Sequence, residues 1–63
     1  MTRRQLLQHL RKQGCEFVRE GSRHSVYVNP RTGAQSSVPR HREIGNNLAG
    51  KICRDLEIPE VGR

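Results

Sequence analysis

The chain has 63 residues and a formal net charge of +6, and only 32% of its residues are hydrophobic. This length allows one small domain, residues 1–63, whose limited core excludes a deep, enclosed substrate pocket. No apolar run approaches the roughly 18 residues that a membrane span needs, and no signal-peptide pattern is present, so we expect a cytoplasmic protein without membrane association.

The first predicted element is a helix that begins after Thr2. Thr2 and Gln5 have the spacing of a capping box, the leucines at positions 6, 7 and 10 recur at helical spacing, and Gly14 is the expected C-terminal end. The other side of this helix is polar and consists of Arg3, Arg4, Gln8 and Arg11.

Three segments have the composition of short strands: Cys15–Glu20, Ser25–Val28 and Ala34–Val38. Phe17 is the largest core candidate of the first strand. A turn is predicted at Asn29–Gly33, between the second and third strands. The third strand is more polar, which places it near an edge of the sheet, and Pro39 ends it.

A second helix is predicted after Gly45, with Asn46 or Asn47 as its N-cap. Its expected apolar stripe consists of Leu48, Ile52 and Leu56, with Ala49 and Cys53 beside them. The two helical stripes are buried most simply on one face of a three-stranded antiparallel sheet. The predicted fold is therefore α+β with the order α-β-β-β-α, and the other face of the sheet stays open.

Charge and cysteine usage limit the classes of ligand. Ten of the twelve Lys and Arg residues are arginines, whose planar guanidinium groups suit phosphate, so a nucleic acid or an acidic protein is the expected partner. Cys15 and Cys53 form no C-x-x-C unit and are predicted to be buried apolar residues. No ligand spacing for a metal is present, and we expect neither a metal nor a cofactor.

The stretch Gly21–Tyr27, G-S-R-H-S-V-Y, holds the main catalytic candidate, His24. RNA carries its own nucleophile, the 2′-hydroxyl, so cleavage needs a base, in-line geometry and charge neutralisation. Histidine can accept a proton at neutral pH. From position alone, the more ordinary interpretation is that His24 begins a strand, on the side of Val26 and Val28, and covers the rim of the core.

An ordered set of residues runs through most of the chain. Its members are Gly14, Phe17-Val18-Arg19, Gly21-Ser22, His24, Tyr27, Asn29-Pro30, Thr32-Gly33, Val38-Pro39-Arg40-His41, Glu43-Ile44, Leu48, Ile52, Arg54-Asp55-Leu56 and Ile58. In this set the chain resembles the HicA family of bacterial toxins. The resemblance implies a fold like that of double-stranded-RNA-binding domains and the activity of an mRNA interferase, the toxin of a type II toxin–antitoxin system, with His24 as the catalytic residue.

Around His24 we expect a group of residues that bind RNA: Ser22, Arg23, Arg40, His41 and Arg42. His41 has a second candidate role, as the acid that protonates the leaving 5′-oxygen. Tyr27 has the opposite strand parity to His24 and is expected to pack or stack rather than react.

The sequence is also compatible with two other functions, and the resemblance implies one protein partner. The chain could be an RNA-binding module without catalysis, or a DNA-binding regulator that uses its last helix for recognition. The resemblance also implies a HicB-like antitoxin, which we expect to be acidic and to cover a sheet edge or the rim around His24. The toxin would then be a monomer alone and part of a hetero-oligomer with the antitoxin.

Overall fold

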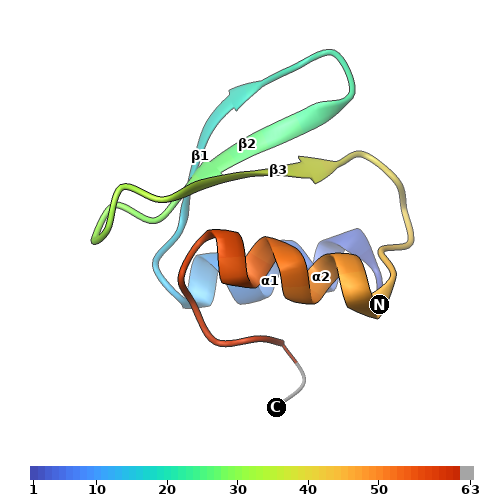
Figure 1. The fold of residues 1–63 in the computed structure, drawn as a ribbon. Helices are drawn as coiled ribbons and strands as arrows, with labels where there is room; N and C mark the ends of the chain where they lie inside the picture. The colour runs from blue at the N-terminus through green and yellow to red at the C-terminus, as the bar shows by residue number, and fades with distance from the viewer. Residues whose placement is uncertain (62–63) are drawn as a thin grey trace.

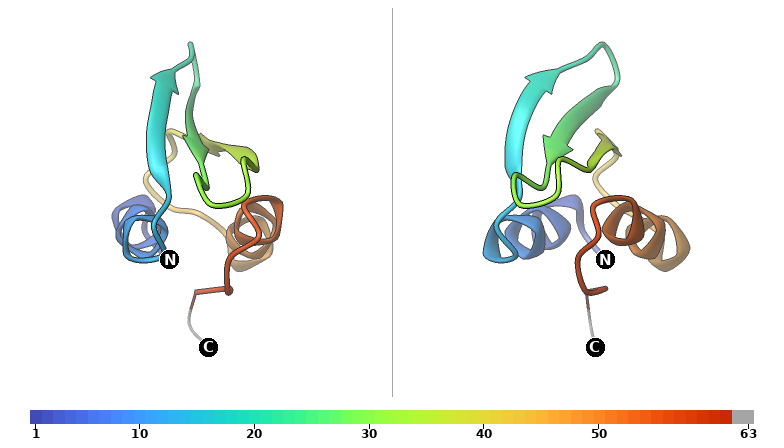
Figure 2. Two further views of the ribbon diagram at one scale, coloured as in Figure 1. Left: turned by 90° about the vertical axis from the view of Figure 1, so that its left-hand side faces the viewer. Right: turned by 60° about the vertical axis from the view of Figure 1, so that its left-hand side comes forward.

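A computed structural model describes residues 1–61 and shows five elements in the predicted order. They are α1 (Arg3–Lys12), β1 (Glu16–Glu20), β2 (His24–Val28), β3 (Gln35–Pro39) and α2 (Asn46–Asp55). The strands form one antiparallel sheet in the order β1-β2-β3, and both helices lie on the same side of it (Figures 1 and 2). The predicted α+β fold is confirmed. No helix among the described residues is long and apolar enough to cross a membrane.

Both ends of α1 follow from its local sequence. The hydroxyl of Thr2 accepts a hydrogen bond from the Gln5 backbone N–H at 3.1 Å, and the Gln5 side chain accepts one from the Thr2 N–H at 3.0 Å. This is the predicted capping box. At the other end, Gly14 has a φ of +89° and its N–H donates to the Arg11 carbonyl at 3.0 Å. The left-handed backbone conformation costs glycine little free energy, so the chain can turn there toward β1.

The core lies between the sheet and the two helices. It consists of Leu6, Leu10, Cys15, Tyr27, Val38, Ile44, Ala49, Ile52, Cys53 and Leu56. Both cysteines are free and buried, as predicted, and burial raises the pKa of each thiol above its ordinary value. Tyr27 is only 6% exposed, which confirms that it packs.

The prediction that Phe17 is a core residue is wrong. Its side chain is 54% exposed, because β1 is an edge strand on which every residue is exposed. Figure 2 shows β1 rising from the end of α1 and away from the helices. The Phe17 ring meets the Tyr27 ring edge-on, with 5.8 Å between centroids, so it shields Tyr27 while its own outer side stays open.

The start of α2 and one residue of its apolar stripe differ from the prediction. Gly45 is the N-cap and makes no side-chain capping bond, and Asn46 and Asn47 belong to the helix. Leu48 is 40% exposed, whereas the rest of the predicted stripe is buried: Ile52, Leu56, Ala49 and Cys53. Gly50 is also buried, and a Cβ there would lie 3.0 Å from a carboxylate oxygen of Glu60.

Asn29 anchors the β2–β3 turn to the end of α2. It is 3% exposed, and its side-chain amide donates to the Leu56 carbonyl at 2.8 Å. Its Oδ1 accepts from the Arg31 N–H at 3.1 Å, and its carbonyl accepts from the Gly33 N–H at 2.7 Å. The predicted turn at residues 29–33 is thus confirmed, and it is also a tertiary contact.

Replacing Asn29 by alanine is expected to lower the free energy of unfolding by about 1–3 kcal/mol, because the buried Leu56 carbonyl loses its donor. Urea denaturation followed by circular dichroism measures this. Asn47→Ala, at an exposed position of α2, is the matched control and should change stability by less than about 0.5 kcal/mol. Equal losses in the two variants would contradict the anchoring role.

Candidate functional site

A cleft of about 280 Å³ opens between the β1–β2 turn and the segment after β3. Its lining residues are Ser22, Arg23, Arg40 and His41. These two segments are distant in sequence and meet because β2 and β3 pair. His24 lies opposite Pro39 in the ladder, and the Arg40 N–H donates to the Arg23 carbonyl at 3.3 Å.

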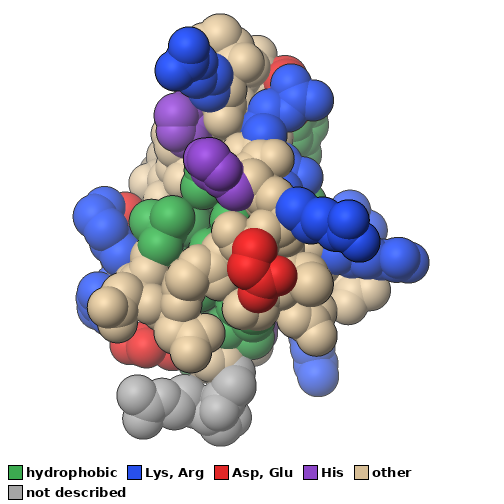
Figure 3. Space-filling model, turned by 90° about the vertical axis from the view of Figure 1, so that its right-hand side faces the viewer, with side chains coloured by type: hydrophobic (Ala, Val, Ile, Leu, Met, Phe, Trp, Pro, Cys, Tyr) green, Lys and Arg blue, Asp and Glu red, His purple; other side chains and the backbone are tan. Residues whose placement is uncertain are grey.

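Four of the six residues predicted to cleave or bind RNA therefore line one cleft. The other two are not among its lining residues: His24 follows Arg23 in the chain, and Arg42 follows His41. All six side chains are exposed. Figure 3 shows histidine side chains on this side of the molecule, between Lys and Arg side chains. The cleft is thus open to solvent and positively charged.

His24 is the first residue of β2, one position earlier than the predicted strand begins. Side chains alternate along a strand. Ser25 contacts Arg3 of α1 and Tyr27 belongs to the core, so His24 has the parity of the face that the helices do not cover. Because His24 is exposed, it does not cover the rim of the core. Its imidazole is free to meet an external ligand.

The turn before His24 depends on a close backbone approach. The Gly21 N–H donates to the His24 carbonyl at 2.7 Å, and a Cβ on Gly21 would lie 3.2 Å from that oxygen. Glycine is therefore the residue that fits here with least displacement. The two exposed loop residues between them, Ser22 and Arg23, are held at the mouth of the cleft.

A polar network beneath the site was not predicted from the sequence. Ser25 is 2% exposed; its hydroxyl donates to Glu20 Oε1 at 2.8 Å and accepts from Arg3 Nη2 at 2.7 Å. Arg3 Nε also donates to the Pro39 carbonyl at 2.9 Å, and Arg40 Nε lies 3.2 Å from Glu20 Oε2. The network joins α1 to all three strands, next to the cleft.

The sequence held one signal for this network. Ser25 shares the strand parity of Tyr27, which directs a hydroxyl toward the core, where it needs a hydrogen-bond partner. Arg3 was predicted only to lie on the side of the helix away from the leucines, and its guanidinium reaches the sheet to supply that partner. Glu20 balances part of the Arg40 charge, whereas Arg23 has no such acid in the network.

The chemical capacity of the site lies in its imidazoles and guanidinium groups. Exposed imidazoles of His24 and His41 are available for proton transfer, and Arg23 and Arg40 can bind anionic oxygens through several N–H donors. Within residues 1–61, no group of three or more His, Cys, Asp and Glu side chains is placed to hold a metal ion. The arrangement suits a phosphate-containing ligand.

Comparison with known proteins gives one match. The family model of the HicA toxin of bacterial toxin-antitoxin systems matches residues 3–58, which include all six candidate residues and every helix and strand of the fold. Searches among curated proteins and among solved structures found no match.

Replacing Ser25 by alanine is expected to lower the free energy of unfolding by about 1–3 kcal/mol, because Arg3 and Glu20 lose the buried hydroxyl that joins them. Chemical denaturation is the measurement. Ser37→Ala, an exposed serine on β3, is the control and should be close to neutral. A Ser25→Ala chain as stable as the parent would show that the network contributes nothing to the fold.

Proposed function

Because this chain belongs to the HicA family of toxins, we propose that it is an endoribonuclease that cleaves mRNA, with His24 as the general base. One observation carries the proposal. The exposed His24 directly follows, in the chain, one of the two arginines that line an open cleft. The family makes the chain the toxin component of a toxin–antitoxin system, and RNA cleavage is the chemistry that this cleft can best perform.

In the proposed reaction, one phosphodiester of the RNA lies in the cleft against Arg23 and Arg40. His24 takes the proton of the neighbouring 2′-hydroxyl, and the 2′-oxygen attacks the phosphorus. The P–O5′ bond breaks, which leaves a 2′,3′-cyclic phosphate on one fragment and a 5′-hydroxyl on the other. The guanidinium groups stabilise the charge that develops on the phosphoryl oxygens.

The leaving 5′-oxygen needs a proton. His41 lines the same cleft and is the candidate acid, with water as the alternative donor. If His41 is the acid, its loss slows cleavage by about the factor that a positioned acid contributes, ~10²-fold or more. If it only binds phosphate, its loss weakens RNA binding and leaves the rate at saturating RNA nearly unchanged.

Two single histidine variants test the assignment on single-stranded RNA in the presence of chelator. His24→Ala is expected to slow cleavage by about 10²–10⁴-fold and to keep RNA binding, because it removes the base and no arginine. His9→Ala is the control, since His9 lies on α1 and its Nε2 is 2.7 Å from the Pro59 carbonyl. The cleaved ends should be a cyclic phosphate and a 5′-hydroxyl.

Two outcomes would overturn the assignment. Unchanged cleavage by His24→Ala would remove this residue from the chemistry. RNA binding by the parent without any cleavage would instead identify an RNA-binding module that is not an enzyme. An RNA substrate with a 2′-deoxy sugar at the cleaved position should resist cleavage by the unsubstituted protein, because it lacks the nucleophile.

We further propose that the antitoxin of this system is acidic, HicB-like and covers the cleft together with His24. The net charge of +6 and the exposure of all six candidate residues support this. Such a partner would inhibit by excluding RNA from the cleft, and opposite charges would speed the encounter.

The association rate of toxin and antitoxin is therefore expected to fall roughly tenfold or more from low to high salt. Stopped-flow or surface-based kinetics would measure it. Arg23→Gln with Arg40→Gln should slow association more than Arg31→Gln, at an exposed position in the β2–β3 turn. A complex that leaves His24 accessible and RNA cleavage undiminished would contradict the proposal.

A further inference from the structure

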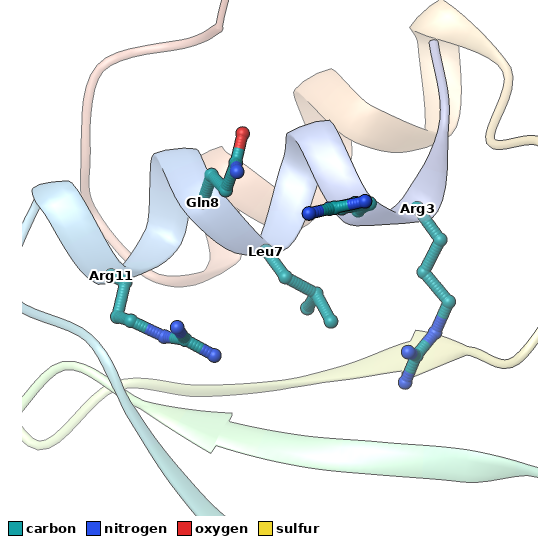
Figure 4. A pocket seen from close by; sticks show the side chains of 5 residues that line it. Arg3, Leu7, Gln8 and Arg11 are labelled. Atoms are coloured by element: carbon teal, nitrogen blue, oxygen red, sulfur yellow. The ribbon is translucent and has the colours of Figure 1, made fainter.

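A second cleft, of about 360 Å³, lies along α1. It is lined by Arg3, Arg4, Leu7, Gln8 and Arg11. In Figure 4, Arg3, Leu7 and Arg11 extend from the helix toward the strands, and Gln8 points the other way. Leu7 is half-buried between the charged side chains. The sequence predicted only the polar side of a helix here.

The charge pattern of α1 indicates a function beyond helix formation. Its ten residues include no acid, and arginines occupy the first two helical positions. The helix dipole disfavours positive charge at that end. Arg3 is explained by its bonds to Ser25 and Pro39. Arg4 has no such explanation, and a local rule broken without a structural gain is a mark of functional sites.

Arg4 and Arg11 present unused donors to this cleft. Within the described part of the chain, neither guanidinium takes part in a salt bridge or a side-chain hydrogen bond, and both residues are exposed. Each guanidinium carries five N–H donors in a planar fork. The lining therefore offers two unengaged forks and the Gln8 amide, with no carboxylate to compete.

The two clefts adjoin through Arg3. Its side chain bonds to the Pro39 carbonyl, and the next residue, Arg40, lines the cleft beside His24. The backbone N–H of Arg3 also donates to the Arg42 carbonyl at 2.8 Å. The longest dimension of the protein is 31 Å, so one strand of RNA can reach both clefts. Small domains that bind single-stranded nucleic acid cover about 4–16 nucleotides each.

We propose that the α1 cleft binds further phosphates of the same RNA strand that His24 cleaves, through Arg4 and Arg11. The inference rests on the proposed function and adds a second, non-reacting part to the RNA-binding surface. RNA fits this cleft better than an acidic protein does. Protein interfaces need buried apolar anchors, and Leu7 is the single apolar residue in the lining, whereas phosphates need only the forks.

The test compares Arg4→Gln/Arg11→Gln with Lys12→Gln/Arg31→Gln, which removes the same charge at exposed positions outside the cleft. The probe is a single-stranded 2′-O-methyl oligonucleotide of about 12 nucleotides, which spans both clefts and has no free 2′-hydroxyl to react. Glutamine keeps the helix propensity of arginine, so folding should be unaffected.

Arg4→Gln/Arg11→Gln is expected to weaken binding roughly 10- to 30-fold near 0.1 M salt and to reduce the slope of log affinity against log salt by about 1.4, the value for two lost phosphate contacts on a single strand. The control should change affinity by less than about threefold, because it removes only long-range attraction. An oligonucleotide of about four nucleotides is too short to reach both clefts, so its affinity should fall much less in Arg4→Gln/Arg11→Gln.

Each other outcome overturns one proposal. Equal losses in the two double variants would refute the α1 site, while cleavage that still depends on His24 keeps the proposed function. A loss of RNA affinity found only in Arg4→Gln/Arg11→Gln, together with full cleavage by His24→Ala, would keep the α1 site and refute the role of His24 in the proposed function. If the α1 variant binds RNA like the parent and binds an acidic antitoxin more weakly, the cleft is a protein-docking site and the inference is wrong.

Discussion

The guanidinium of Arg3 is the contact on which the arrangement of this protein depends. It extends from α1 to the sheet and donates to the Ser25 hydroxyl and the Pro39 carbonyl. Hydrogen bonds from a charged donor contribute about 1.5–3 kcal/mol each, which is a large share of the stability of a domain this small. Without them, strand pairing and the exposed Arg40–Glu20 ion pair would be left to join the hairpin turn at residues 21–24 to the segment after β3.

The small core explains why any chemistry must take place on the surface. The buried apolar residues are used to pack two helices against β2 and β3, and β1 has none to bury. No enclosed cavity can form in such a layer, so both clefts are open and owe their character to charge. Open clefts favour a long ligand that crosses the surface, because each contact is shared with solvent and several are needed.

The features that were predictable from the sequence are those set by neighbouring residues. The capping box of Thr2 and Gln5, the left-handed Gly14 and the turn at residues 29–33 each involve residues a few positions apart. Phe17 and Leu48 were misplaced because their burial depends on what covers them. Phe17 stands on an uncovered edge strand, and Leu48 lies exposed on α2 although Ile52 and Leu56 of the same stripe are buried.

The residue types of the candidate site were also predictable, but their proximity was not. Ser22 and Arg23 meet Arg40 and His41 only because His24 pairs with Pro39. The neighbouring valines and serines do not fix that pairing by themselves. The α1 cleft was missed for a related reason, since a row of arginines on a helix has the same pattern whether it faces solvent or a groove.

The polar network helps to fix the register of β2 in the sheet. A slip of one residue in the β2 register would exchange the two faces of the strand. Ser25 would then leave the core, and Arg3 and Glu20 would lose the hydroxyl that joins them. The same slip would turn His24 from the open face toward the helices. The buried Ser25, together with the core residue Tyr27, thus keeps the exposed histidine on the outer face of the sheet.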